Sequence, residues 1–174
     1  MLLALLAVLV QALDGVPVDA LRAPAGTKAI VYIFTTTDCP ISNRYAPEIQ
    51  RLQQRFAPRG VLFRLVYPGR VARESDVREH MKQFAYEGTE AVRDPQLALA
   101  KFTGATVTPE AAVVVNEKVV YHGRIDDRYV ELGVERPSPT THDLADVLIA
   151  VLAGKPVARP NAPAVGCFIA DLAR

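Results

Sequence analysis

The chain alternates between short apolar runs and longer stretches in which apolar residues recur every three or four positions. The short runs are rich in β-branched and aromatic residues and are bounded by turn-forming residues, a combination typical of strands. The predicted strands are residues 29–36, 61–67, 90–93, 111–115 and 118–125. The last two are separated by Asn116 and Glu117, and we predict that they form a β-hairpin.

Helical periodicity fills the segments between these strands. In the first of them, Ile49 and Phe56 belong to one apolar face, and Pro47 predicts a kink after the first turn. Ser75 is the predicted N-cap of the second helix. The predicted helices are residues 40–56, 76–84, 95–104 and 143–152.

The order of the elements predicts the architecture. Strand–helix–strand units imply parallel strands joined by right-handed crossovers, whereas the hairpin adds antiparallel strands. The expected fold class is therefore α/β, a three-layer sandwich with a mixed central sheet and helices on both faces. The length of 174 residues suits a single domain.

The N-terminus begins with an uncharged apolar run at residues 1–10, which has the length of a signal-peptide core. We interpret residues 1–12 as a signal peptide that lies outside the fold. No Lys or Arg precedes Arg22, so a buried first helix or strand is the alternative. The run is too short to cross a bilayer, and no membrane span is expected in the mature chain.

The C-terminal third contains two unusual segments. Residues 126–141 are long for a loop in a compact domain, and such loops are usually functional or disordered. We expect the domain itself to cover residues 13–154. Residues 155–174 are then a proline-rich strap that carries Cys167. The formal net charge of +1 offers no basic excess for a nucleic-acid partner.

The candidate chemistry lies in residues 31–44, which read V-Y-I-F-T-T-T-D-C-P-I-S-N-R. A buried strand there delivers Cys39 to the first turn of a helix, where free backbone N–H groups and the helix dipole favour an anion. A thiolate in that position has a lowered pKa and is nucleophilic. Pro40 suits the first helical position because it needs no N–H. The alternative is that Cys39 is a small, inert core residue.

Over about residues 20–154 the chain resembles proteins of the thioredoxin fold, and most closely those of the redoxin and peroxiredoxin-like branch. The resemblance rests on Cys39-Pro40 after the first long strand, on Thr36 three residues before Cys39, and on Thr108-Pro109 before the hairpin. The segments D-C-P-I-S-N-R-Y-A-P, G-R-I-D-D-R-Y and V-G-C are similar to those of exported bacterial redoxin-domain proteins. The resemblance implies a cis-proline at Pro109 that faces the reactive cysteine.

The chain departs from the family pattern in two places. Thioredoxins carry C-x-x-C, but Ser42 stands at the second position and cannot resolve a mixed disulfide. Peroxiredoxins carry a proline where this chain has Tyr32, and their catalytic arginine has no secure match, although Arg124 and Arg128 are candidates. The second departure weakens a peroxidase assignment.

Cys167 is the only candidate for a resolving thiol. Two cysteines in an oxidising compartment favour a disulfide between Cys39 and Cys167. A redox pair would form and break that bond in each cycle, because the resolving thiol attacks the mixed disulfide or sulfenic acid on Cys39. A permanent bond that pins the strap remains open, as does the absence of pairing.

Further residues are assigned to the site through the resemblance. Thr36 would hydrogen-bond the thiolate or a bound peroxide, and Arg124 would stabilise the thiolate. Pro109 would present the backbone beside it to an extended thiol substrate. Substrate contacts are expected at Pro40, Ser42, Thr108 and Arg128. Thr36 has a structural alternative as a strand-end hydroxyl, and the arginines as a self-paired surface cluster.

The three histidines give no metal signal of their own. His80, His122 and His142 are scattered, and none has zinc-like spacing with either cysteine. A spatial site formed by Cys39, Cys167 and His122 remains a minor alternative. We expect no metal and no organic cofactor, because the sulfur atoms themselves carry the electrons.

Together these features predict an exported, periplasmic or cell-envelope, thiol–disulfide oxidoreductase. Its partners would be a thiol or disulfide protein substrate and a thioredoxin-like electron donor. Two alternatives stay open: a thiol peroxidase acting on peroxide, and a non-catalytic thioredoxin-fold binding module with a structural disulfide or metal site.

Overall fold

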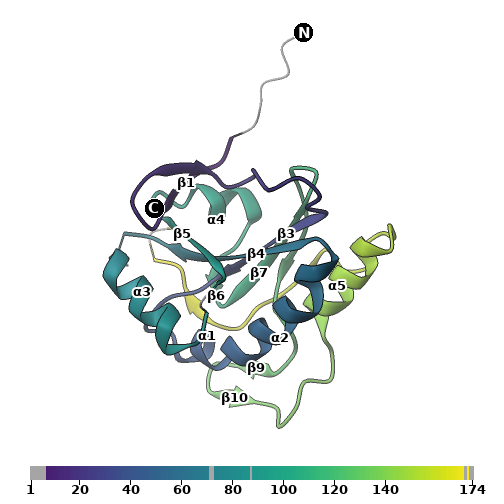
Figure 1. The fold of residues 1–174 in the computed structure, drawn as a ribbon. Coiled ribbons are helices and arrows are strands. Elements are labelled where there is room, and N and C mark those ends of the chain that lie inside the picture. The colour runs from purple at the N-terminus through teal and green to yellow at the C-terminus, as the bar shows by residue number, and fades with distance from the viewer. Residues whose placement is uncertain (1–6, 71–72, 87, 171, 173–174) are drawn as a thin grey trace.

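The computed structural model describes residues 7–70, 73–86, 88–170 and 172. Figure 1 shows the helices packed around a central sheet. The strands are β1 (Leu9–Ala12), β2 (Pro17–Asp19), β3 (Ala29–Phe34), β4 (Val61–Pro68), β5 (Glu90–Asp94), β6 (Val107–Thr108), β7 (Glu110–Val115), β8 (Lys118–Gly123), β9 (Tyr129–Glu131), β10 (Val134–Glu135), β11 (Asn161–Ala162) and β12 (Cys167–Phe168). The helices are α1 (Pro40–Arg44), α2 (Ala46–Phe56), η1 (Ala57–Arg59), α3 (Glu74–Gln83), α4 (Ala98–Thr103) and α5 (Asp143–Leu152).

The central sheet has the order β11-β8-β7-β3-β4-β5-β1-β2. β3, β4 and β5 run parallel to one another, as the strand–helix–strand order predicts. The β7–β8 hairpin is antiparallel and joins the sheet beside β3. The sheet is therefore mixed, and the predicted α/β three-layer fold is confirmed.

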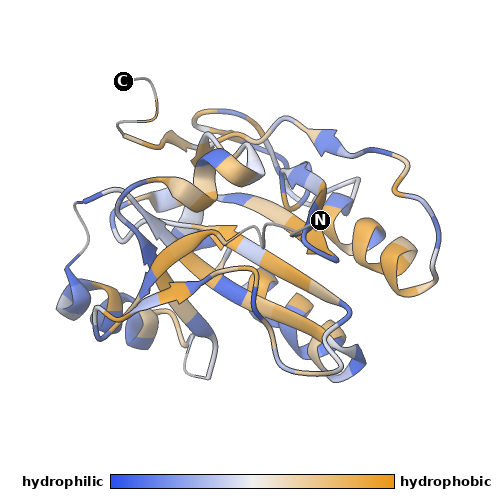
Figure 2. Ribbon diagram, turned by 90° about the horizontal axis from the view of Figure 1, so that it is seen from above, coloured by the Kyte–Doolittle hydropathy of each residue, from blue (hydrophilic) through white to orange (hydrophobic). Residues whose placement is uncertain are grey.

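Both faces of the central strands are buried because β3 is apolar at every position. Its odd-numbered residues, such as Val31 and Ile33, pack in the core beneath α2, α3 and α5. Its even-numbered residues, such as Tyr32 and Phe34, pack in a second core with α4. Figure 2 shows how continuously apolar residues follow the central strands. Each large side chain buried in this way contributes about 1.5–3 kcal/mol to stability.

The predicted helices form, with different boundaries. The expected break near Pro47 lies one turn after Cys39, where Tyr45 separates α1 from α2. The second helix begins at Glu74, so Ser75 lies inside it and is not its N-cap. The helix predicted at residues 95–104 starts later than expected, as α4 at Ala98. The Asp94 carboxylate accepts a hydrogen bond from the Ala100 N–H and so holds the preceding turn.

The expectation that residues 1–12 lie outside the fold is wrong for the described part of that segment. β1 pairs antiparallel with both β2 and β5. Val8 and Val10 are buried, whereas Leu9 between them is 59% exposed. The apolar run therefore alternates as a strand with one buried face does, and the alternative of a buried first strand holds for residues 8–12. Residues 1–6 lie outside the described residues.

The two long C-terminal segments are ordered against the domain. The predicted loop at residues 126–141 contains the small β9–β10 hairpin. The strap runs back along the sheet, with β11 parallel to β8 and β12 antiparallel to β6. Gly123 permits the first contact, because a Cβ there would lie 2.1 Å from the Ala162 carbonyl oxygen.

Candidate active site at Cys39 and Cys167

Cys39 lies where the sequence predicted it, between the end of β3 and the start of α1. It is the N-cap residue of α1, followed by Pro40 at the first helical position. Its carbonyl accepts the Asn43 N–H at 3.0 Å, which closes the first helical turn. The side chain is buried, with 2% of its surface exposed. The sulfur is therefore held in a fixed position at the carboxyl end of the parallel strands.

Cys167 reaches Cys39 from the other end of the chain. The strap places Cys167 opposite Thr108 in the β12–β6 pairing. The two Sγ atoms are 2.8 Å apart, and both cysteines are free thiols in this structure. Unlike Cys39, Cys167 is exposed. The sequence left their pairing open, and the structure brings the two sulfurs into direct contact.

The two thiols have opposite electrostatic environments. Burial tends to raise the pKa of Cys39, but hydrogen bonds from the Cys167 thiol and from Ser42 and Cys167 backbone groups outweigh it and lower the pKa. The Ser42 hydroxyl, which has no hydrogen bond of regular geometry, adds to the lowering. Although Cys167 is exposed as a residue, partial desolvation of its sulfur, together with the hydrogen bond and charge of Cys39, raises its pKa to about 11. Of the two sulfurs, Cys39 therefore loses its proton more readily, and Cys167 keeps its proton to a higher pH.

A cavity of about 290 Å³ opens beside the two sulfurs. Thr36 and Arg70 contribute to its wall together with both cysteines. No hydrogen bond joins Thr36 to Cys39 among the described residues, so its predicted contact with the thiolate is not present here. Arg70 was missed in the sequence. Its position after β4, the strand parallel to β3, is the signal that could have found it, because parallel strands gather polar groups at their carboxyl ends.

The predicted cis-proline is present. The Thr108–Pro109 peptide bond is cis. The Thr108 carbonyl lies 3.2 Å from Cys39 Sγ and accepts the thiol proton when Cys39 is protonated. Pro40, in contrast, is exposed on the surface beside the site. Thr108 thus lies at the sulfur, next to the cis bond, and its strand β6 is already paired with β12 of the strap.

A buried hydrogen-bonded chain behind the cavity was also missed. Tyr67 lines the cavity, and its hydroxyl is 2.8 Å from Nδ1 of His80. Nε2 of His80 is 2.8 Å from Oδ1 of Asn43, which can only accept. Nε2 therefore carries the proton, and the Tyr67 hydroxyl donates to Nδ1. Burial lowers the pKa of His80, which keeps the ring neutral. The chain fixes α3 against the turn that carries Cys39.

The two predicted arginines are not at the sulfurs. The Arg124 guanidinium donates to Asp143 at 2.9 Å and to the Thr141 hydroxyl at 3.2 Å. The Arg128 guanidinium lies 6.0 Å from the centre of the Tyr45 ring. Neither arginine lines the cavity beside Cys39. The prediction that they assist Cys39 or its substrate is wrong, because Asp143 at the start of α5 pairs with Arg124 and Arg128 lies over the ring of Tyr45.

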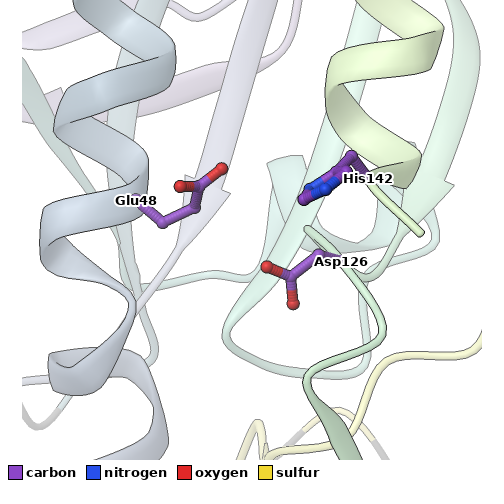
Figure 3. Close-up of side chains that lie close together, drawn as sticks. All are labelled: Glu48, Asp126 and His142. Atoms are coloured by element: carbon purple, nitrogen blue, oxygen red, sulfur yellow. The ribbon is translucent and has the colours of Figure 1, made fainter. Parts of the chain in front are cut away.

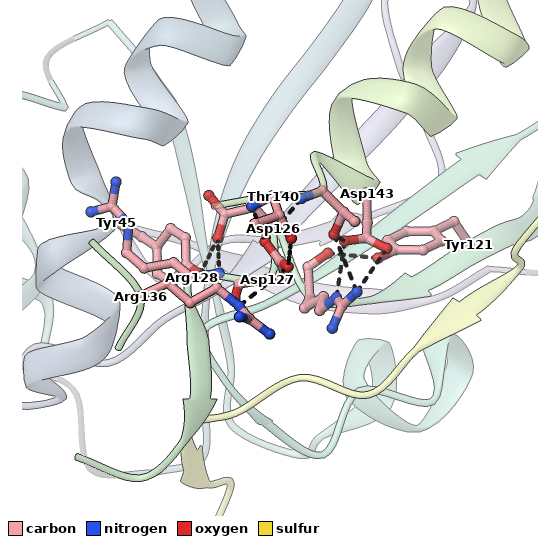
Figure 4. A network of polar contacts seen from close by, with 10 residues as sticks. Tyr45, Tyr121, Asp126, Asp127, Arg128, Arg136, Thr140 and Asp143 are labelled. Carbon is pink, nitrogen blue, oxygen red and sulfur yellow. Dashed lines mark hydrogen bonds and ion pairs between the residues drawn. The ribbon is translucent and has the colours of Figure 1, made fainter. Parts of the chain in front are cut away.

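Figure 4 shows the polar network around the loop between β8 and α5, residues 124–142. Asp127 accepts hydrogen bonds from the Thr140 hydroxyl and from the backbone N–H groups of Thr140 and Thr141. These bonds, with an ion pair to Arg136, hold the pKa of Asp127 well below its usual range. Asp126 accepts the Tyr45 hydroxyl at 2.5 Å. The loop is thus a structural clamp between α2 and the start of α5.

Within the described part of the chain, one group of side chains has the spacing of metal ligands. Glu48, Asp126 and His142 each offer an atom within 4.8 Å of the others, and Figure 3 shows them facing a common space. Arg51 binds both carboxylate oxygens of Glu48, at 2.6 and 2.7 Å, so a cation is already paired there. His122 binds Glu110 and not the cysteines. The alternative metal site of Cys39, Cys167 and His122 is therefore not formed.

Comparison with known proteins agrees with this fold. Residues 7–148 match the Redoxin family. An uncharacterized conserved protein from Geobacillus kaustophilus superimposes with a TM-score of 0.79 at 23% identity, over 94% of this chain and 87% of that protein. A hypothetical protein from Sinorhizobium meliloti gives 0.77 at 23% identity, over 94% and 90%.

More distant structures share the fold. A secreted disulfide oxidoreductase from Mycobacterium tuberculosis gives a TM-score of 0.55 at 16% identity, over 84% of this chain and 94% of that protein. No curated protein matches the chain. Among the described residues, no helix has the length and apolarity that a bilayer crossing requires. The family match covers most of the domain, including the strand and turn that position Cys39, and the chain belongs to the Redoxin family.

Proposed function

We propose that the protein is a thiol–disulfide oxidoreductase in which Cys39 is the nucleophile and Cys167 is the resolving partner. The observation that carries the proposal is the 2.8 Å contact between two free thiols whose pKa values are shifted in opposite directions. A lowered pKa provides the attacking thiolate, and the neighbouring thiol stays protonated until it is needed. Family membership and the fold support the same chemistry.

Reduction of a substrate disulfide would proceed in two exchanges. The Cys39 thiolate attacks one substrate sulfur, the substrate S–S bond breaks, and the released thiolate takes up a proton. Cys167 then loses its proton and attacks Cys39 Sγ, which expels the second substrate thiolate. Two electrons have passed to the substrate, and a Cys39–Cys167 disulfide remains. A dithiol donor, such as a thioredoxin-like protein, restores both thiols, and the reverse sequence oxidises a substrate dithiol.

The remaining residues would position the reacting groups. The Thr108 carbonyl and Pro109 fix the approach to Cys39, and the Ser42 hydroxyl stands free to donate to the thiolate. Pro40 forms an exposed surface at which a partner protein can contact the start of α1. No organic cofactor enters these steps, because each electron pair moves between sulfur atoms.

A thiol peroxidase is the second candidate, favoured by Thr36 and Arg70 in the cavity wall. In that reaction the Cys39 thiolate attacks the peroxide oxygen, giving a sulfenic acid and an alcohol or water. Attack by Cys167 then forms the same disulfide and releases water. Rapid sulfenic acid formation by micromolar peroxide in a Cys167→Ser variant would favour this candidate over disulfide exchange.

The test is the reduction potential of the cysteine pair. The protein is equilibrated in glutathione or dithiothreitol buffers, acid-quenched and alkylated, and the number of free thiols is read by intact mass. A working pair is expected to have a potential above about −300 mV, whereas a structural disulfide would lie below it. Two thiols that stay free in oxidising buffer would refute the pair.

We also infer that the protein is exported to an oxidising compartment. The support is the secreted nature of one structural neighbour. Because β1 belongs to the sheet, a mature protein that keeps this fold retains Val8–Ala12. Fractionation of cells with N-terminal sequencing of the protein tests both points, and a purely cytosolic pool would contradict the inference.

A further inference from the structure

The contact between the strap and β6 has the geometry of a bound peptide. β12 lies antiparallel to β6, with Cys167 opposite Thr108 and Phe168 opposite Val107. The Ile169 N–H donates to the Thr106 carbonyl at 2.9 Å and extends the pairing. An extended segment thus adds to the edge of a strand and delivers its own sulfur to Cys39. This is β-augmentation within one chain.

The pairing of β12 with β6 restricts which residue can precede the cysteine. A Cβ on Gly166 would lie 2.2 Å from the Thr108 carbonyl oxygen and 2.6 Å from its carbon. These are backbone atoms next to Cys39, so they cannot move aside as a flexible side chain would. Only glycine therefore allows a cysteine-containing segment to lie this close to β6 at this register.

The two residues after the cysteine are distinguished as well. Phe168 is 84% exposed, so its side chain is not recognised by this domain. Ile169 is 6% exposed and belongs to the core on the α4 side of the sheet, which also contains Val10 and Leu97. The domain therefore binds an aliphatic side chain two positions after the cysteine, whereas the residue between them can be of any type.

We propose that the β6 edge is a binding site for an extended segment with glycine before its cysteine and an aliphatic residue two positions after it, and that the strap occupies this site in competition with the substrate. The proposal rests on the thiol–disulfide function proposed above and names its substrate class. Substrate can pair with Val107 and Thr108 only after β12 has left.

The strap can leave without being lost. β11 pairs with β8, Ala162 is buried, and its carbonyl accepts the Arg124 N–H at 2.9 Å. Residues 163–170 therefore form a short movable segment beyond a fixed anchor. A tether of this length keeps Cys167 at a high effective concentration near Cys39, ready to resolve a mixed disulfide.

The experiment uses full-length Cys167→Ser protein, in which Cys39 is the sole thiol. A peptide with the sequence V-G-C-F-I, its cysteine activated as a disulfide with thionitrobenzoate, is the probe. The Cys39 thiolate attacks the peptide sulfur, and the released thionitrobenzoate is measured by absorbance. Replacing the peptide glycine by alanine is expected to slow the reaction about tenfold, because the added methyl group collides with β6.

The same change in the strap should act in the opposite direction. Adding Gly166→Ala to the protein is expected to speed the reaction with V-G-C-F-I about tenfold, because the strap no longer competes. Ile169→Asp provides a second way to release the strap and should give the same sign. Leu132→Ala, at an exposed site between β9 and β10, is the matched control. Replacing the peptide phenylalanine by alanine should change the rate by less than about twofold.

Each failure has a distinct meaning. Equal rates with all peptides, or no acceleration by either strap variant, would overturn the proposal while leaving Cys39 reactive. A dependence of the acceleration on protein concentration would also overturn it, because the strap would then occupy the site of a second copy. If Cys39 fails to react even with the small activated disulfide of thionitrobenzoate, the proposed function itself is wrong.

Discussion

The site at Cys39 and the charged loop after β8 both contain candidate catalytic residues in the sequence, but their key groups are bonded differently in the structure. At the cysteines, the Ser42 and Thr108 hydroxyls are buried without partners, and two sulfurs share one contact. In the loop, Arg124 and Asp127 are each held by several polar groups. Buried atoms of Asp126, Arg128 and Tyr129 in the loop also lack partners, so the two regions differ in their chemistry: one holds two thiols in contact, and the other holds charges that are already paired.

The comparison explains why the loop was misassigned. The run G-R-I-D-D-R-Y contains residue types that could stabilise a thiolate, but type alone does not say which partner each charge finds. Asp143 comes from the start of α5, 19 residues after Arg124, and its ion pair with Arg124 keeps that guanidinium away from Cys39. Four substitutions test whether the cysteine site is reactive and the loop structural, and they are described from the largest expected effect to the smallest.

Loss of the nucleophile should abolish exchange. Cys39→Ser is expected to lower the rate of reaction with an activated disulfide by about 10³-fold or more, because the lowered pKa belongs to this sulfur. Cys167→Ser is the matched variant and should still form a mixed disulfide, which then accumulates. Alkylation by iodoacetamide over a pH series should give a higher midpoint for Cys39 in Cys167→Ala, since the hydrogen bond from the Cys167 side chain to the thiolate is then lost. A retained rate in Cys39→Ser would place the chemistry at Cys167.

Breaking the loop should cost stability and leave the chemistry alone. Arg124→Gln removes the partner of Asp143, whose side chain is 6% exposed, and is expected to lower the free energy of unfolding by about 1–3 kcal/mol. Urea denaturation measures this change. The control is Arg78→Gln, which breaks an exposed pair with Glu74 and should cost less than about 0.5 kcal/mol. A large loss of Cys39 reactivity in folded Arg124→Gln would show that this arginine serves the site after all.

The same loop should give a distinct acid response. The pKa of Asp127 is held below its unfolded value of about 3.9 by the Thr140 and Thr141 hydrogen bonds, so its stabilising effect is full above that value and fades as pH falls. The difference in unfolding free energy between wild type and Asp127→Asn should therefore be constant from about pH 8 to 5 and shrink towards pH 2. Glu131→Gln, on the exposed β9 strand, is the control. A difference that grows on acidification would contradict the assigned direction.

The sequence predicted the central fold well because its signals are local. The apolar run of β3, the periodicity of α2 and the Thr108–Pro109 pair are each readable within a few residues. The strap was predicted as a segment, but its register on β6 depends on the close fit of Gly166 to Thr108. Such a fit joins residues 58 positions apart, and no periodicity encodes it.

Buried polar chains were harder to foresee for the same reason. His80 looked isolated because its partners, Tyr67 and Asn43, come from a strand and from a different helix. Arg70 was overlooked because its relevance comes from the parallel pairing of β3 with β4, which brings two strand ends together. Strand β1 was misread because a short apolar run is compatible with both a signal peptide and a strand.

Substitution of Thr36 should have the smallest effect on disulfide exchange, and it best distinguishes disulfide exchange from peroxide reduction. Thr36 lines the cavity but donates no hydrogen bond to Cys39, so Thr36→Val should change the rate of disulfide exchange by less than about threefold. A peroxide, in contrast, would need the hydroxyl to hold its oxygen atoms, and the loss of one such donor at a reacting oxygen costs about 10²-fold. Stopped-flow rates with an activated disulfide and with hydrogen peroxide, measured on the same preparation, give both values. Thr36→Ser, which keeps the hydroxyl, should restore any loss. A small effect on both reactions leaves Thr36 as a strand-end residue, whereas a large effect on peroxide alone would make peroxide reduction the better account of the site.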